Sequence, residues 1–120
     1  MDGDGDLDLV TNEWNDAPQV LISDLSERTT LRFLQVRLVG TVSNRDGLGA
    51  MVRVHCGSRV QTRFHDGKSG YLAQSSLPLY FGLGSDTAVD RIEVVWPSGR
   101  RQVRTGPIAL NGTLELVEPQ

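Results

Sequence analysis

The chain has 120 residues, about the length of one domain, of which 38% are hydrophobic and 22% charged. This composition excludes a disordered chain, no apolar run approaches the roughly 20 residues of a membrane-spanning helix, and the single cysteine excludes an internal disulfide framework. The net charge of −3 is unevenly spread, because residues 1–27 hold eight acidic residues and no Lys or Arg. We therefore expect two segments, residues 1–27 and residues 28–120, the first of them suited to a cation.

Short runs rich in Val, Ile, Leu, Thr and Phe alternate with turn-forming residues, and no stretch shows helical periodicity over the length of a helix. This pattern predicts an all-β fold with many short strands. In chain order, the expected strands are residues 7–11, 19–23, 32–39, 50–56, 60–65, 78–82, 91–96, 101–104, 108–110 and 113–117. Several of them alternate apolar and polar residues, as antiparallel strands with one buried face do. We expect an antiparallel β-sandwich, with a jelly-roll-like strand order left open.

The C-terminal part of the chain contains a strong signal for a short hairpin. Asn111 and Gly112 separate the apolar runs at residues 108–110 and 113–117. An Asn-Gly pair in this position favours a type I′ turn, so we expect these two runs to pair with each other.

The strands expected at residues 50–56 and 60–65 form a second hairpin, whose register depends on the length of its loop. A three-residue loop places Val52 opposite Phe64 and keeps the apolar residues of both strands on one face. A two-residue loop would instead place Val52 opposite Arg63. The hydrophobic pattern favours the three-residue loop.

Four aspartates alternate with other residues at the start of the chain, namely Asp2, Asp4, Asp6 and Asp8. Calcium takes about six to eight oxygen ligands, often from carboxylates on a sharply turning backbone, and glycines permit such a turn. The segment is not an EF-hand, because it lacks the Glu at the twelfth position. We expect a calcium-binding loop with these aspartates as ligands, and the alternative is a solvated acidic turn.

This loop resembles the calcium-binding repeat of the FG-GAP or VCBS type, found in integrin-like β-propellers. The family pattern has aspartates at its first, third, fifth and ninth positions; Asp2, Asp4 and Asp8 match the last three, and Asp6 supplies the seventh. The first aspartate would precede Met1. The resemblance therefore implies that the chain starts inside a repeat and that its N-terminal segment is the end of a propeller blade.

The rest of the chain carries separated blocks in a fixed order. They are LVG, SNRDGLGA, GYLAQS, FGLG, VDRI and VWPSG, at residues 38–40, 43–50, 70–75, 81–84, 89–92 and 95–99. In order and spacing these blocks resemble the ASPIC/UnbV domain over roughly residues 30–117. The resemblance implies a domain that follows FG-GAP repeats in secreted proteins, an extracellular, periplasmic or cell-surface location, and a role in adhesion or calcium-dependent matrix association.

The block at residues 43–50 is typical of a tight loop between two strands. Asn44 and Asp46 suit turns in which a side chain accepts from the backbone, and Arg45 can pair with Asp46, Asp90 or a ligand. A purely structural loop is the first interpretation. Ligand binding by Asn44, Arg45 and Asp46 is the second.

Arginines also gather on the second hairpin. In the three-residue-loop register, Arg53 and Arg63 face each other on the outer face, and Arg59 lies in the loop. Like charges in opposition favour an anion between them, and a sulfated glycan would supply it, with Trp96 or Tyr71 as a stacking platform. The alternative is that these arginines are solvated or meet the acidic N-terminal segment.

Catalytic and nucleic-acid functions are not favoured. His55 and Cys56 are adjacent in an expected strand and point to opposite faces, which argues against joint metal ligation with His65. No nucleophile elbow, P-loop or dinucleotide motif occurs, and the pI of about 5.2 does not suit binding to nucleic acid.

The sequence predicts a non-catalytic module of an extracellular calcium-binding protein, without membrane insertion, whose partner is a protein or glycan. The alternatives are a glycan-binding sandwich and a structural cap on preceding β-propeller repeats.

Overall fold

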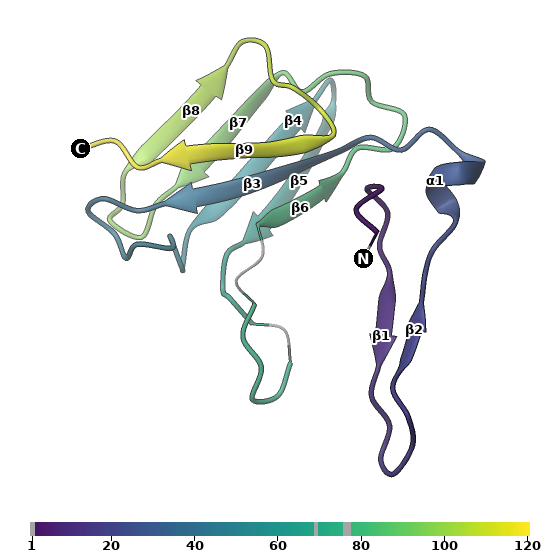
Figure 1. Ribbon diagram of the computed structural model, residues 1–120. Coiled ribbons are helices and arrows are strands. Elements are labelled where there is room, and N and C mark those ends of the chain that lie inside the picture. The colour runs from purple at the N-terminus through teal and green to yellow at the C-terminus, as the bar shows by residue number, and fades with distance from the viewer. Residues whose placement is uncertain (1, 69, 76–77) are drawn as a thin grey trace.

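The computed structural model describes residues 2–68, 70–75 and 78–120, so Met1, where the repeat was expected to be interrupted, lies outside the described residues. Its elements follow in chain order (Figure 1): β1 (Leu9–Thr11), β2 (Gln19–Leu21), α1 (Leu25–Arg28), β3 (Phe33–Val39), β4 (Met51–Cys56), β5 (Arg59–Phe64), β6 (Leu79–Gly82), β7 (Arg91–Val95), β8 (Arg101–Thr105) and β9 (Gly112–Val117). Most expected strands are present with ends shifted by one or two residues. The four-residue helix α1 was not expected. No helix in the described ranges is long and apolar enough to cross a membrane.

Seven of these strands form two sheets that face each other, so the predicted all-β sandwich is confirmed (Figure 1). One sheet has the strand order β6-β3-β9, and the other has the order β5-β4-β7-β8. Alternate residues of β3, β4 and β7 point inward, as their sequence pattern predicts. The buried core consists of Leu34, Val36, Leu38, Ala50, Val52, Val54, Cys56, Phe81, Leu83, Val89, Ile92, Val94, Trp96 and Leu116.

The predicted hairpin at Asn111 and Gly112 is wrong, because β9 pairs in parallel with β3. Asn111 adopts a positive φ of 57°, but Gly112 is not among the positive-φ residues, whereas a type I′ turn needs both. Asn111 instead ties the start of β9 to β3: its N–H donates to the Phe33 carbonyl (2.8 Å), and its Oδ1 accepts from the Phe33 N–H (3.0 Å). The parallel pair also departs from the expected all-antiparallel sheets and from a jelly roll.

The predicted register of the β4–β5 hairpin is also wrong. Val52 lies opposite Arg63, so the loop has two residues, Gly57 and Ser58. Gly57 has a φ of 56°, which suits the first central position of a type II′ turn. The hydrophobic pattern misleads because β5 is an edge strand that buries little: Val60 is 50% exposed and Phe64 67% exposed.

The inward-facing side of β5 is polar and reaches the other sheet. The Gln61 amide donates to the Gly82 carbonyl at 2.8 Å, and the Arg59 guanidinium donates to the Leu83 carbonyl. These side chains cover the side of the sandwich where β5 and β6 are both edge strands. Contacts between the two sheets therefore select the register.

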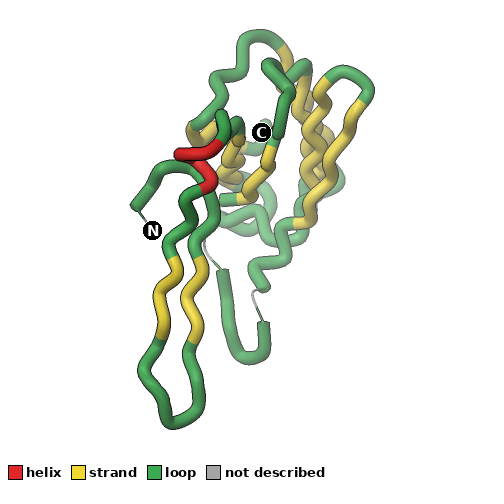
Figure 2. The backbone as a smooth tube through the Cα atoms, turned by 90° about the vertical axis from the view of Figure 1, so that its right-hand side faces the viewer, coloured by secondary structure: helices red, strands yellow, loops and turns green. Residues whose placement is uncertain are grey.

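The strands β1 and β2 form a separate two-stranded sheet that extends away from the sandwich (Figures 1 and 2). Its apolar side chains, Leu9, Val10, Val20 and Leu21, are all about half exposed. An isolated two-stranded hairpin is only marginally stable in water. The hairpin thus presents apolar surface that the described residues do not cover.

Candidate functional site

The aspartate-rich loop, residues 2–8, turns sharply at its two glycines. Gly3 and Gly5 have φ angles of 85° and 101°, a backbone conformation that only glycine adopts without strain. The backbone N–H of Asp4 donates to Asp2 Oδ1 (3.4 Å), and that of Asp6 donates to Asp4 Oδ1 (3.2 Å). Each aspartate at the tip thus folds the next part of the loop, which directs the remaining carboxylate oxygens toward α1.

The carboxylates of this loop meet Ser23 and Ser26, which lie just before and within the first turn of α1. Asp8 Oδ1 accepts from the Ser23 N–H and Asp6 Oδ2 from the Ser26 N–H, both at 3.0 Å, and Asp4 Oδ2 accepts from the Ser26 hydroxyl. The hydrogen bond from the Ser26 hydroxyl, followed by the one from the backbone N–H of Asp6, lowers the pKa of Asp4. Ser26 thus draws two of the four predicted ligands to one place.

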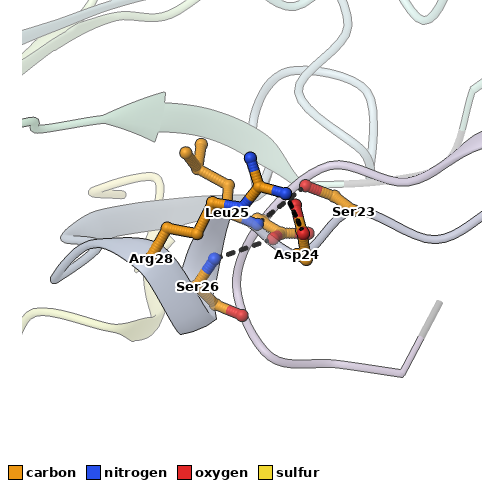
Figure 3. A network of polar contacts seen from close by, with 6 residues as sticks. Ser23, Asp24, Leu25, Ser26 and Arg28 are labelled. Atoms are coloured by element: carbon orange, nitrogen blue, oxygen red, sulfur yellow. Dashed lines mark hydrogen bonds and ion pairs between the residues drawn. The ribbon is translucent and has the colours of Figure 1, made fainter.

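The segment around α1 is ordered by its own short-range contacts (Figure 3). Ser23 Oγ accepts from the Leu25 N–H at 3.2 Å, and Arg28 forms an ion pair with Asp24 one helical turn away. These contacts hold the backbone N–H of Ser26 in position to meet the loop.

The aspartate-rich loop also docks against the sandwich. Phe33 and Tyr80 stack with their ring centroids 5.3 Å apart, and the Tyr80 hydroxyl donates to the Gly5 carbonyl. A Cβ at Gly5 would lie 2.4 Å from Phe33 Cε1, so only glycine fits there. Burial, with the nearby carboxylates of Asp6 and Asp4 as smaller causes, raises the pKa of the Tyr80 phenol. Nothing in the sequence pattern pointed to this contact.

The chemistry of the loop fits a hard cation, although its geometry is incomplete. The atoms that the loop could offer to a metal ion are carboxylate and carbonyl oxygens, the ligands that calcium prefers. Asp6 Oδ1 is buried and accepts no hydrogen bond in the described part of the chain. Within residues 2–68, 70–75 and 78–120, however, no three His, Cys, Asp or Glu side chains are grouped closely enough to hold a metal ion. Hydrogen-bond donors from Ser23 and Ser26 meet the carboxylates instead.

Among the described residues, the acidic side chain with the largest pKa shift lies outside the aspartate-rich loop, directly after β9. The Glu118 side chain is only 2% exposed. Its Oε2 accepts from the backbone N–H groups of Thr41, Val42 and Ser43 at 3.0, 2.9 and 2.7 Å, and its Oε1 accepts from the hydroxyls of Ser43 (2.8 Å) and Ser98. The carboxylate therefore fixes the loop after β3 to the turn after β7. Glu118 could not be predicted from the sequence, because a single acidic residue at the end of a strand carries no signal.

The ionisation of Glu118 makes the stability of the chain depend on pH. Burial by itself would raise its pKa, but hydrogen bonds from Ser98, Ser43 and Val42 outweigh burial and lower the pKa from 4.5 to about 2. A pKa lowered by folding stabilises the chain above about pH 4.5, and this contribution is lost as the pH falls toward 2.

We expect the urea midpoint of the wild type to exceed that of Glu118→Gln at pH 6, and the difference to shrink between pH 4.5 and pH 2. The exposed Glu115, in β9, supplies the control Glu115→Gln, which should follow the wild type throughout. A difference between Glu118→Gln and the wild type that stays constant down to pH 2 would contradict the assignment.

The predicted ligand residues Asn44, Arg45 and Asp46 lie in a tightly held loop. Asn44 bonds Leu48 twice, accepting from its N–H (2.8 Å) and donating to its carbonyl (2.7 Å), while the Arg45 carbonyl accepts from the Gly40 N–H at 2.9 Å. The Arg45 and Asp46 side chains are 88% and 66% exposed, and their charged groups lie 3.6 Å apart. The backbone of the loop is therefore rigid, and its charged side chains face solvent.

The arginines expected to gather on the second hairpin are separated, and Arg59, expected in its loop, is the first residue of β5. Arg53 lies opposite Thr62 and not Arg63, so the predicted pairing of Arg53 with Arg63 is wrong and their side chains point to opposite faces of the sheet. Arg53 lies 4.0 Å from Glu93, and Arg59 pairs with Asp86. Of the two proposed stacking residues, Trp96 is buried in the core and offers no exposed platform, whereas Tyr71 is 94% exposed.

The histidines and the cysteine lie in separate surroundings. His55 Nε2 lies 3.2 Å from Glu93, and hydrogen bonding from Arg91 together with the charges of His55 and Arg53 outweighs burial to lower the pKa of Glu93. Cys56 is a buried free thiol, and burial raises its pKa. A thiol in this state is a poor nucleophile.

With this geometry established, comparison with protein families finds a match to the family described as ASPIC and UnbV over residues 40–120, two thirds of the chain and most of the sandwich. The chain belongs to the ASPIC and UnbV family. The match begins after β3, ten residues later than the resemblance suggested. The domain therefore includes the loop of residues 43–50 and Glu118, but not the aspartate-rich loop.

Curated relatives extend the likeness of this ASPIC/UnbV chain to its N-terminal segment. It is 33% identical over 123 residues to cartilage acidic protein 1 of Mus musculus, covering 100% of this chain and 19% of the relative. The proteins of the same name from Xenopus tropicalis and Homo sapiens are 34% and 32% identical, over 99% and 100% of this chain and 18% of each relative. The chain thus spans a little under a fifth of the relatives that it matches.

Proposed function

We propose that this ASPIC/UnbV chain is a non-catalytic recognition module of an extracellular protein, and that calcium binds its aspartate-rich loop. The observation that carries the proposal is the position of this loop between two structural units. Its carboxylates contact Ser23, just before α1, and Ser26, within α1, and its Gly5 contacts Phe33 and Tyr80 of the sandwich. A ligand held there would stabilise the orientation of the hairpin relative to the sandwich.

Asp2, Asp4, Asp6 and Asp8 are the residues that would hold the cation, and the buried Oδ1 of Asp6 supports this assignment. Bound calcium would supply positive charge that offsets the mutual repulsion of these carboxylates. The N–H and the hydroxyl of Ser26 donate hydrogen bonds to Asp6 and Asp4, so they compete with calcium for two of the four proposed ligands. Cation binding therefore requires Ser26 to shift or to share its acceptors.

A non-catalytic role is supported by the surroundings of two side chains whose pKa values are shifted. Glu118 is enclosed by its five hydrogen-bond donors, and Cys56 is buried with a raised pKa. Neither group is available to a substrate. The extracellular location is supported by the name that the relatives share, cartilage acidic protein 1; these relatives are longer proteins.

We expect excess calcium to raise the melting temperature of the full chain relative to a chelator at matched ionic strength. A ligand at 100 times its Kd adds about 2.7 kcal/mol, or several degrees for a domain of this size. Asp6→Asn should abolish most of the shift, whereas Glu13→Gln, which removes one exposed negative charge from the β1–β2 loop, should preserve it. Magnesium at the same concentration controls for general screening of charge.

A second candidate is a structural cap on preceding β-propeller repeats. The exposed apolar residues of β1 and β2 favour it, because they suit a hairpin that completes a larger sheet. This cap requires no ion. The absence of a calcium shift in the melting experiment would therefore count against the calcium-dependent module and in favour of the cap.

A further inference from the structure

A depression of about 290 Å³ lies beside the rigid loop that follows β3. Arg37 of β3, Arg45 of this loop and His65, directly after β5, line it together with Asp46 and Gln74. The three basic residues come from three segments that are separate in the sequence. Only the fold brings them to one place.

The charge of this depression is mainly positive and largely uncompensated. Arg37 is exposed and makes no ion pair or side-chain hydrogen bond in the part of the chain that the structure describes, although Glu115 lies opposite it on β9. Arg45 is 88% exposed, and its ion pair among the described residues is with Asp46, at 3.6 Å. Two guanidinium groups therefore keep most of their donors available, and such groups bind carboxylates and sulfates well.

The backbone that presents Arg45 is held in place before any ligand arrives. Glu118 accepts hydrogen bonds from three consecutive N–H groups at the start of the loop. Within the loop, the Asn44 side chain is hydrogen-bonded to the backbone of Leu48, and the Arg45 carbonyl accepts from the Gly40 N–H. A site on a rigid backbone binds with a smaller loss of conformational entropy. The loop thus has the rigidity expected of a binding site, although it lies on the surface.

Resting on the recognition role proposed above, we propose that this depression binds one acidic saccharide unit, sulfated or uronic, through Arg37, Arg45 and His65. The volume lies at the lower end of the range for small-molecule sites, which suits a single sugar ring. Asp46 and Gln74 place hydrogen-bond acceptors beside the basic groups, as a ligand with hydroxyls next to its acidic group requires. An acidic peptide offers many carboxylates and few hydroxyls, so Asp46 disfavours it.

The test is titration calorimetry of the full chain with a heparin-derived tetrasaccharide. Arg37→Ala and Arg45→Ala should each weaken binding about tenfold or more, because each removes charge-assisted hydrogen bonds. Arg101→Ala, which removes the same charge from exposed β8 on the other sheet, should change the affinity less than about twofold.

Three results would overturn the proposal: no binding, equal losses in all three variants, or equal binding of a polyglutamate peptide with the same dependence on Arg37 and Arg45. Inorganic sulfate is the remaining arm, and it should compete only weakly, since it lacks the hydroxyls. Equal affinity for sulfate alone would be a fourth result that overturns the proposal, because it would leave a simple anion site. Titrations run with calcium and with chelator distinguish a failure of the saccharide site from a failure of the calcium-binding module. If calcium stabilises the chain but no saccharide binds, only the saccharide proposal is contradicted.

Discussion

Replacing Glu118 with alanine is expected to lower the melting temperature by at least about 10 °C, because the change leaves buried donors without acceptors. The side chain accepts from three backbone N–H groups and from two serine hydroxyls. The hydroxyls can rotate toward other acceptors, but the N–H groups of Thr41, Val42 and Ser43 are fixed by the backbone. Thermal unfolding monitored by circular dichroism measures the effect.

Two variants make this result specific. Glu118→Gln should be less harmful than alanine, because its carbonyl oxygen can accept from the N–H groups while its amide donates to the hydroxyls of Ser43 and Ser98. Glu115→Ala, in β9 and exposed, should change the melting temperature by only a degree or two. Equal effects of Glu118→Ala and Glu115→Ala would show that the carboxylate does not hold the loop.

Replacing Gly40 with alanine is expected to destabilise the chain by about 3 kcal/mol, the upper end of the usual cost of overpacking. A Cβ at Gly40 would lie 2.0 Å from the backbone oxygen of Asn44 and 3.1 Å from that of Ser43. Backbone atoms cannot move aside as the end of a flexible side chain can, so the loop must open. Opening also breaks the hydrogen bond from the Gly40 N–H to the Arg45 carbonyl.

Gly82→Ala is the matched control, since a Cβ at Gly82 meets no atom within 4 Å and its φ is not positive. That variant should unfold within a few degrees of the wild type. Urea unfolding of both variants measures the difference. If the saccharide site is correct, Gly40→Ala should also weaken tetrasaccharide binding at temperatures where it remains folded, because Arg45 moves with the loop. Unchanged unfolding of Gly40→Ala would mean that the loop is not held as described.

Much of the sandwich could be predicted because the alternation of residues in a strand is a local property. The apolar positions of β4 and β7 alternate with polar ones, and the structure buries Val52, Val54, Ile92 and Val94 as expected. Pairing was predicted less well. The Asn111 turn and the β4–β5 register were both assigned from adjacent sequence, whereas contacts with β3 and with β6 decide them.

The candidate sites likewise combine local features that the sequence predicts with distant contacts that it does not. The alternating aspartates and the sequence around Arg45 could be recognised without the structure, because each lies within a few consecutive residues. The partners of these groups could not be recognised. Tyr80 meets Gly5 across 75 residues, and Glu118 meets Thr41 across 77.

By itself, the sequence determined the all-β class, most of the strand positions (the strand expected at residues 108–110 is absent), the acidic N-terminal loop and the resemblance to the ASPIC/UnbV domain, since these depend on composition, short-range periodicity and ordered motifs. Only the tertiary structure decided that β9 joins β3 in parallel, that Arg53 and Arg63 separate, and that Arg37, Arg45 and His65 share a depression. The physical reason is that packing two sheets together selects strand pairs and side-chain neighbours by the surface that they bury and the hydrogen bonds that they satisfy, and these partners are distant in the chain.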